Sequence, residues 1–403
     1  MFDLLIRGGR VIDPSQNMDA VTDVAVTGGK ISGIGPEIAP GGAAMIIDAA
    51  GRIVTPGLID LHTHVYDGFL NNGANPDVVG VNQGVTTVVD GGSAGHAIFA
   101  GFPRYVVPAA RTDIYCFLHI GSFGLAVMPE LWRQEEINPE ATEAVIANHP
   151  DLIRGVKLRI VGKLIASEGI AVVKTAQKTA KRFGLPLMVH IGDRNRWIPP
   201  LLTRELLALL EKGDILSHFC TGQPGSLLGD DGRAAPELVA ARERGVVLDV
   251  ANGISNFSYA VARAMMAQGI LPTTLSTDVT RTSVQGPAYG LTVTMSKFLE
   301  LGLPLERMIA MTTLHPARAV GIDDRKGALK PGMDADISIL EIQPGRWRLP
   351  DSHEELLDVT RLIRPVLTVK AGVPIPPDCV PIKEHVFPFS KRLNDRTVNG
   401  TGR

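Results

Sequence analysis

Short apolar runs alternate with turns along most of the chain. After residue 56, eight of these runs start at intervals of roughly 25 to 40 residues, about the length of one strand and helix unit. We predict strands at 57–64, 86–90, 114–119, 155–160, 186–190, 215–218, 246–250 and 274–278. Amphipathic spacing between them predicts helices at 168–183, 204–212 and 259–268. Near-continuous apolar runs are typical of parallel strands buried on both faces, so we expect an α/β fold with a (β/α)8 TIM barrel.

Both ends of the chain have a different pattern. Residues 1–55 contain short β-branched segments separated by glycine and proline turns, and similar segments return late in the chain. We predict that 1–55 and 323–389 together form a small flanking β-sandwich domain beside the barrel at 56–322. The polar segment 390–403 is expected to be a mobile tail.

Composition narrows the classes of function. The 403 residues include 40 lysines and arginines against 42 aspartates and glutamates, which gives no basic surface for nucleic acid or an anionic membrane. No segment reaches the ~20 apolar residues that span a membrane, and no signal peptide is recognisable. The 3 cysteines are too widely spaced for a disulfide framework or a cysteine zinc site. We therefore expect a cytoplasmic protein that acts on a small molecule.

Polar residues lie at or near the carboxyl ends of several predicted strands, where barrels of this type carry their catalytic groups. His62 and His64 are two residues apart on the first strand, so both side chains point to the same side. The other candidates, on strands four, five, six and eight, are Lys157, His190, His218 and Asp278. Four histidines and a carboxylate at one barrel mouth indicate a metal site.

Each of these residues also has another interpretation. His190 and His218 could be hydrogen-bonded core residues, and Asp278 could cap a helix that follows it. Lys157 lies in the middle of an apolar strand and could be a Schiff-base nucleophile. These interpretations explain the residues one at a time, whereas a metal site also explains why all of them share one end of the barrel.

The sequence resembles the amidohydrolase superfamily of metallohydrolases, specifically its dihydroorotase-like binuclear branch. The motifs that carry the resemblance are 56–64, Lys157, His190, His218, Asp278 and 327–336. The resemblance implies that Lys157 is carboxylated by carbon dioxide and bridges two divalent metal ions, expected to be Zn²⁺. The remaining ligands that it implies are His62, His64 and Asp278 for one ion and His190 and His218 for the other.

The mechanism implied by this resemblance is attack of a hydroxide, held by the metals, on a substrate carbonyl. Asp278 would be the catalytic proton shuttle between the hydroxide and the leaving group. Only a neutral amine reacts with carbon dioxide, so burial or a metal must lower the pKa of Lys157.

The expected substrate follows from finer similarities. Tyr66 stands where dihydroorotases typically carry an arginine, and 249–253 departs from the pattern expected at the seventh strand. Segments 86–95, 156–163 and 295–298 look most like an amidohydrolase/deacetylase subgroup. This implies hydrolysis of an acyl ester or amide of a small carboxylate-bearing substrate, either an acetylated α-hydroxy acid such as acetyl-(R)-mandelate or an N-acyl amino acid. A cyclic-amide hydrolase of the dihydroorotase or hydantoinase type and a non-enzymatic scaffold are the alternatives.

A carboxylate-bearing substrate needs a cation. Arg159 follows Lys157 by two residues, so it shares the inward face of the strand and could bind a carboxylate bidentately. It could instead form a structural ion pair with Asp90 or Asp193. Further candidates for the pocket wall are Tyr66, His119 and Asn252. The apolar exterior of the barrel would tolerate a homo-oligomer.

Overall fold

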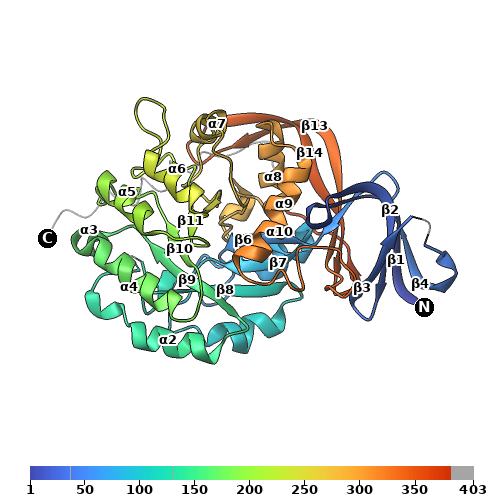
Figure 1. Ribbon diagram of the computed structural model, residues 1–403, viewed down its shortest axis with the longest axis horizontal. Helices are drawn as coiled ribbons and strands as arrows, with labels where there is room; N and C mark the ends of the chain where they lie inside the picture. Colours follow the sequence, from blue (N-terminus) through green and yellow to red (C-terminus); the bar gives the residue numbers. More distant parts are fainter. Residues whose placement is uncertain (37, 129, 383–403) are drawn as a thin grey trace.

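The computed structural model describes residues 1–36, 38–128 and 130–382, which form a TIM-barrel-like α/β part and a flanking β sheet (Figure 1). The first part is built on a seven-stranded parallel sheet in which spatial order follows chain order. Its strands are β6 (Leu58–Thr63), β7 (Val85–Asp90), β8 (Asp113–His119), β9 (Ile153–Arg159), β10 (Leu187–His190), β11 (Ile215–Ser217) and β12 (Val247–Asp249). Every residue of β6 and β7 is buried, as expected for strands covered on both faces.

The predicted eighth strand at 274–278 differs from the other seven. Thr274 forms a parallel bridge with Asp249, and Val279 forms one with Thr63, so this segment joins the two edges of the sheet. It is held by isolated bridges and not by a regular strand pairing, and three of its side chains, including that of Thr274, donate to neighbouring carboxylates. Ser276 Oγ donates to Asp249 at 2.7 Å, and Thr277 Oγ1 donates to Asp60 at 2.6 Å.

Helices follow most of the parallel strands and cover the outside of the sheet (Figure 1). They are α1 (Pro76–Val79), α2 (Pro139–Asn148), α3 (Lys163–Glu168), α4 (Ile170–Lys181), α5 (Pro200–Leu209), α6 (Pro236–Glu243), α7 (Tyr259–Ala267), α8 (Leu291–Glu300), α9 (Leu305–Thr312) and α10 (Leu314–Ala319). Single 3-10 or π turns lie at η1 (Pro14–Gln16), η2 (Pro40–Gly42), η3 (Val81–Gln83), η4 (Phe102–Val106), η5 (Val107–Ala109), η6 (Gly124–Ala126), η7 (Gln134–Glu136) and η8 (Ser283–Gln285). None of the helices in the described ranges is long and apolar enough to cross a membrane.

The helix predicted at 259–268 is confirmed as α7, and the other two predicted helices are present with different ends. The helix predicted at 204–212 begins earlier, at Pro200, because proline is well suited to the first helical turn. The helix predicted at 168–183 begins after Gly169, whose positive φ of 56° separates α3 from α4.

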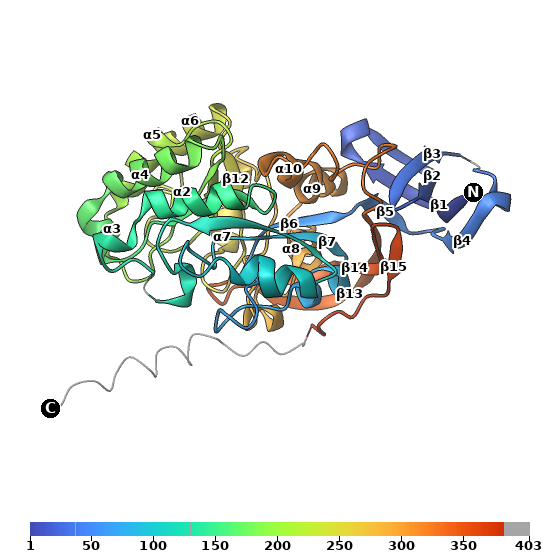
Figure 2. The ribbon, with the colours of Figure 1, turned by 90° about the horizontal axis from the view of Figure 1, so that it is seen from below.

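The flanking sheet brings together segments that are far apart in the sequence. Its strands are β1 (Phe2–Asp13), β2 (Met18–Thr27), β3 (Lys30–Gly35), β4 (Ala43–Asp48), β5 (Ile53–Pro56), β13 (Ile337–Pro350), β14 (Leu356–Lys370) and β15 (Val373–Ile375). They pair in the order β15-β14-β13-β5-β1-β2-β3, with β4 beside β1. Figure 2 shows β1 to β4 at the end of the molecule opposite α5 and α6.

A sandwich of two facing sheets was predicted, but these strands form one continuous sheet. Ile31 of β3 and Val369 of β14 come from distant strands of that sheet, yet they belong to the same apolar cluster. A single sheet that curls round its own core buries the same apolar surface as a sandwich, which is why the hydrophobic pattern did not distinguish the two. The predicted tail at 390–403 and residues 383–389 lie outside the described residues.

The hairpin formed by β13 and β14 reaches from the flanking sheet back to the barrel. Its tip hydrogen-bonds to the loop that follows β12 and to the start of α7: the Ser352 N–H donates to Phe257 O at 3.0 Å, and Asp351 Oδ2 accepts from the Tyr259 N–H at 3.0 Å. One of the loops at the mouth of the barrel is therefore held by the flanking sheet.

Candidate metal centre

Three of the predicted ligands form a compact cluster. His62 lies on β6, His64 follows that strand directly, and Asp278 lies in the segment that joins β12 to β6. One donor atom from each residue lies within 4.8 Å of the others. His64 Nε2 is 3.0 Å and His62 Nε2 is 3.8 Å from Asp278 Oδ1.

Lys157 lies beside this cluster in the middle of β9. Its Nζ is 3.0 Å from His62 Nε2, and the side chain is fully buried. Burial lowers the pKa of Lys157 to about 7, because the ammonium form loses its hydration, and the positive charge of Arg159 adds to the effect while Asp278 opposes it. A large fraction of Lys157 is therefore a neutral amine at neutral pH.

The other two histidines complete a continuous group of imidazoles. His190 ends β10 and His218 follows β11, and their ring centroids are 4.3 Å apart. His218 also lies 5.3 Å from the His62 ring, with its Nε2 4.0 Å from Asp278 Oδ2. Burial lowers the pKa of His218 to about 3 and that of His190 well below its ordinary value, so both are neutral.

Neighbouring groups fix which nitrogen of each ring faces the cluster. Ser93 Oγ donates to Asp90 at 2.7 Å, so His64 Nδ1, at 2.9 Å from the same Oγ, must donate to it. His218 Nδ1 donates to Ala251 O at 2.7 Å. On the neutral His218 ring, Nε2 is then an unprotonated lone pair, and the Nε2 atoms of both rings point toward Asp278. Contacts of this kind orient metal-binding histidines in many proteins.

These donors fit a divalent metal. His64 Nε2 and a carboxylate oxygen of Asp278 face each other at 3.0 Å, a contact that holds either a proton or a cation between the two atoms. His218 Nε2 is buried without a hydrogen-bond partner among the described residues. Imidazole nitrogens with a carboxylate oxygen are a donor set that Zn²⁺ and related ions accept.

The backbone around the cluster is strained and closely packed. His218, Ala251 and Asp278 have positive φ angles of 67°, 43° and 48°, which non-glycine residues seldom adopt. Gly91 and Gly92 lie against His62 and Lys157, where a Cβ atom would clash with the imidazole ring and with the lysine Cγ. The geometry of the ligands therefore depends on close approach of the loop after β7.

The predicted cation, Arg159, is paired with a residue that the sequence analysis missed. Its Nη1 lies 2.9 Å from Glu130 Oε1, in the loop after β8. The two suggested partners accept backbone N–H groups instead. Asp90 accepts those of Val65, Gly92 and Ser93. Asp193 accepts those of Asn195, Trp197 and Ile198. Arg159, Glu130 and His190 line a cavity of about 170 Å³.

Two of the other three pocket candidates have structural partners. Tyr66 stacks between Phe69 and Phe102, with ring centroids 4.7 and 4.2 Å away, and its hydroxyl donates to Ile98 O. Because Tyr66 is fully buried in this stack, the structure does not support it as a pocket residue. Asn252 Oδ1 accepts from Lys297 Nζ at 2.9 Å.

His119 remains available for a ligand. Its Nδ1 accepts the Gly121 N–H at 2.9 Å, and its buried Nε2 has no partner. Burial lowers its pKa to about 4, so the ring is neutral. Sequence reasoning missed Glu130 and Lys297. Glu130 lies in an irregular loop with no periodic pattern, but the lysine at 297 within an apolar helical run was a visible signal.

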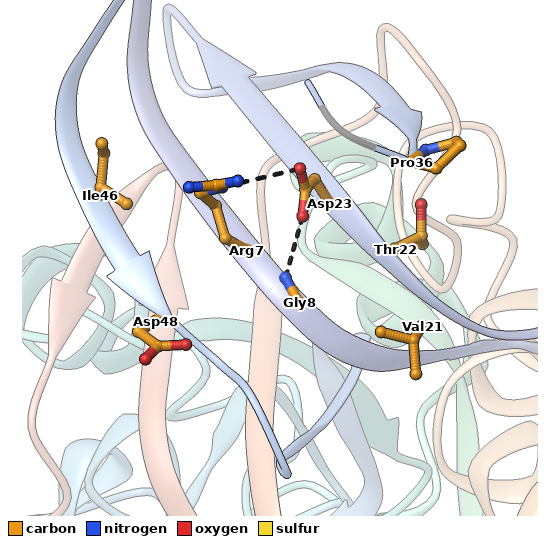
Figure 3. A pocket seen from close by; sticks show the side chains of 8 residues that line it. All are labelled: Arg7, Gly8, Val21, Thr22, Asp23, Pro36, Ile46 and Asp48. Carbon is orange, nitrogen blue, oxygen red and sulfur yellow. Dashed lines mark hydrogen bonds and ion pairs between the residues drawn. The ribbon is translucent and has the colours of Figure 1, made fainter. Parts of the chain in front are cut away.

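A larger hollow of about 630 Å³ lies in the flanking sheet, and Figure 3 shows its lining. Asp23 is its central acid. It accepts the Gly8 and Ile38 N–H groups and lies 3.9 Å from Arg7 Nε, so its oxygens are already occupied. Because the polar groups at the centre of this hollow bond to one another, the histidine cluster is the better candidate site.

Comparison with known proteins identifies the family. The chain matches the amidohydrolase family over residues 53–375. It is 34% identical over 352 residues to a protein named deacetylase from Agrobacterium fabrum, covering 85% of this chain and 84% of that protein. A crystal structure of an adenine deaminase matches with a TM-score of 0.86 and 30% identity, covering 93% of this chain and 100% of that one. A crystal structure of a dihydroorotase matches with a TM-score of 0.85 and 31% identity, covering 94% and 99%.

Proposed function

Because this chain belongs to the amidohydrolase family and is a metal-dependent hydrolase, we propose that it cleaves an acyl ester or amide of a small carboxylate-bearing substrate. The observation that carries this proposal is that one residue, His190, both belongs to the imidazole group and lines the cavity that contains Arg159. A substrate carboxylate near Arg159 would leave its acyl group within reach of the metal centre. The substrates are acetylated α-hydroxy acids or N-acyl amino acids.

The proposed centre holds two divalent ions, Zn²⁺ being the expected metal. His62, His64 and Asp278 would hold one ion, and His190 and His218 the other, with a carboxylated Lys157 between them. Support comes from the unpartnered His218 Nε2, which faces the cluster, and from the lowered pKa of Lys157, since only a neutral amine reacts with carbon dioxide. Such ions would polarise a substrate carbonyl and make water acidic enough to attack it at neutral pH.

The protein side chains then handle the substrate and the proton. Asp278 faces the cluster with both oxygens and is placed to accept a proton from the attacking water and to return it to the leaving group. Burial alone would raise the pKa of Asp278, but the contact with His64 and the neighbouring histidines hold it below its ordinary value, so it starts as a carboxylate. Arg159 would orient the substrate through its carboxylate.

A cyclic-amide hydrolase is the second candidate, favoured by the similarity to a dihydroorotase structure. The same site would attack a ring amide. A screen of zinc-loaded protein against N-acyl amino acids, O-acetyl hydroxy acids and cyclic amides separates the candidates. We expect turnover in the first two libraries; activity confined to cyclic amides would refute the proposal.

Carboxylation of Lys157 predicts a covalent signal that is independent of activity. Protein loaded with zinc in ¹³C-bicarbonate should show a carbamate resonance that is absent from a Lys157→Met variant. The variant should also bind about one ion where the wild type binds about two, because the bridging anion is lost. Lys163→Met, on α3, is the control and should retain both signals. A carbamate that persists in Lys157→Met would place the modification elsewhere.

The role assigned to Arg159 predicts a selective change in KM. Arg159→Ala should raise KM for acidic substrates by about 10- to 100-fold, the usual effect of losing a hydrogen-bonded charge, and should leave KM for neutral esters nearly unchanged. Arg154→Ala, on the same strand but at the opposite end, is the matched control. An equal rise in KM for acidic and neutral substrates would show that Arg159 only supports the local structure.

A further inference from the structure

Glu130 is a buried carboxylate with unused hydrogen-bonding capacity. Its side chain is only 2% exposed, and Oε1 forms an ion pair with Arg159 Nη1 at 2.9 Å. Apart from this ion pair, neither carboxylate oxygen has a hydrogen-bond partner within the described part of the chain. Buried carboxylates are normally satisfied by several donors, because the desolvation of an ionised group is costly. Glu130 therefore has acceptor positions that a ligand could fill.

Those positions face the cavity beside the metal centre. Glu130, Arg159 and His190 all line this hollow of about 170 Å³. Arg159 is 19% exposed at its side chain, so it can still donate to a ligand from the cavity side. The wall thus offers an acceptor and a donor side by side, about one hydrogen bond apart. A ligand that matches it carries a donor and an acceptor attached to the same atom.

We propose that Glu130 is a specificity-determining residue that accepts a hydrogen bond from the N–H of an acylated amino acid, while Arg159 binds the carboxylate of the same substrate. This inference rests on the proposed function and narrows it to amides. In an N-acyl amino acid the N–H and the carboxylate are attached to one carbon, which suits the paired wall. The matching O-acyl hydroxy acid has an ester oxygen there, an acceptor that would face the acceptor oxygens of Glu130.

Glu130 also suits the products of amide hydrolysis. Water adds across the C–N bond, the acyl carbon gains the oxygen, and the departing nitrogen takes up a proton. At neutral pH the released amine gains a further proton from solvent and becomes a cation, which a buried carboxylate stabilises. An alcohol released from an ester gains no such charge.

The test compares matched pairs of N-acetyl amino acids and O-acetyl hydroxy acids with the same side chain, in both configurations. Both members of a pair carry a carboxylate. If a Glu130 variant disturbs Arg159, both substrates are affected alike, and the effect cancels in the amide-to-ester ratio. The ratio of kcat/KM is measured for wild type, Glu130→Gln and Glu130→Met. The ratio of Kd values is measured by calorimetry in the Asp278→Asn background, where turnover is slow. Glu135→Gln, an exposed glutamate of the same loop region, is the control.

In the Asp278→Asn background with Glu130 intact, we expect the amide to bind at least about tenfold more tightly than the ester. In Glu130→Met, the amide-to-ester ratios of affinity and of kcat/KM should both fall by about 10- to 100-fold. The fall should be smaller in Glu130→Gln, which keeps a neutral acceptor. The control should match the wild type. Ratios that do not change in either Glu130 variant would overturn the inference, as would the absence of binding by both series. If the wild type bound both series but hydrolysed neither, the proposed function would be refuted. The Kd ratio would then still test the role of Glu130.

Discussion

Replacing Asp278 by asparagine is expected to lower kcat by about 10²- to 10⁴-fold, the range typical of losing a general base. Asparagine has nearly the same shape and can still present an oxygen to the cluster, but it cannot accept the proton of the attacking water. It also tolerates the left-handed backbone at this position, where φ is 48°. The loss should therefore appear in turnover and not in folding.

Three measurements separate these effects. Metal content by elemental analysis and the thermal midpoint should stay close to wild type in Asp278→Asn, while kcat falls. Asp230→Asn, in an exposed loop, is the control, and its metal content, thermal midpoint and kcat should all match the wild type. If kcat in Asp278→Asn stayed within a factor of a few of the wild type, another group would have to move the proton.

Replacing Lys326 by methionine is expected to lower the free energy of unfolding by about 3–5 kcal/mol, as when one partner of a buried ion pair is removed. Lys326 Nζ lies 2.6 Å from Asp113, 3.1 Å from Asp334 and 2.5 Å from Asp336, and its side chain is 2% exposed. Methionine fills similar space but leaves these carboxylates without their central cation. Lys370 reaches two of them, Asp113 and Asp336, and would offset part of the loss.

The pH dependence of this effect follows from the pKa shifts. Burial alone would raise the pKa of Asp113, and likewise that of Asp334, but the neighbouring lysines lower both below their ordinary values. Their contribution is therefore present above the unfolded pKa of ~3.9 and is lost as the pH falls through the folded value. Burial lowers the pKa of Lys326, but the carboxylates raise it overall, so its contribution is lost only in strong base.

Urea unfolding of Lys326→Met at several pH values tests this prediction. The deficit relative to wild type should be full between about pH 5 and 9 and should shrink below about pH 4. Lys330→Met, four residues away and exposed, serves as the control. A deficit that does not depend on pH would point to altered packing instead of lost charge interactions.

The grouping of these side chains could be predicted from the sequence because they follow a simple rule. Parallel strands place their carboxyl ends at one mouth, and His62, His64 and His190 each lie at or next to the end of a strand, so the strands bring them together regardless of the loops. Lys157 was equally visible, because a lysine inside an apolar strand is costly unless it has a special role.

The residues that sequence reasoning missed or misplaced depend on tertiary contacts without a local pattern. Glu130 lies in an irregular loop, and its pairing with Arg159 follows from how that loop folds over the barrel. Tyr66 follows the histidine pair closely, but its ring points away from the cluster and stacks between Phe69 and Phe102. The single curled sheet of the flanking part could not be predicted either. An alternating pattern indicates which face of a strand is buried, but it does not indicate whether one sheet or two sheets enclose the core.

The hairpin of β13 and β14 has a consequence for the order in which the protein assembles during synthesis. Asp351 at its tip accepts a hydrogen bond from the Tyr259 N–H, 92 residues earlier in the chain. The segment after β12 therefore lacks its contact with the hairpin until the ribosome has released residue 351. At ~5–20 residues per second this delay is on the order of five to twenty seconds. We expect nascent chains that end before residue 350 to form barrel secondary structure without ordered metal ligands around Ala251 and Asp278.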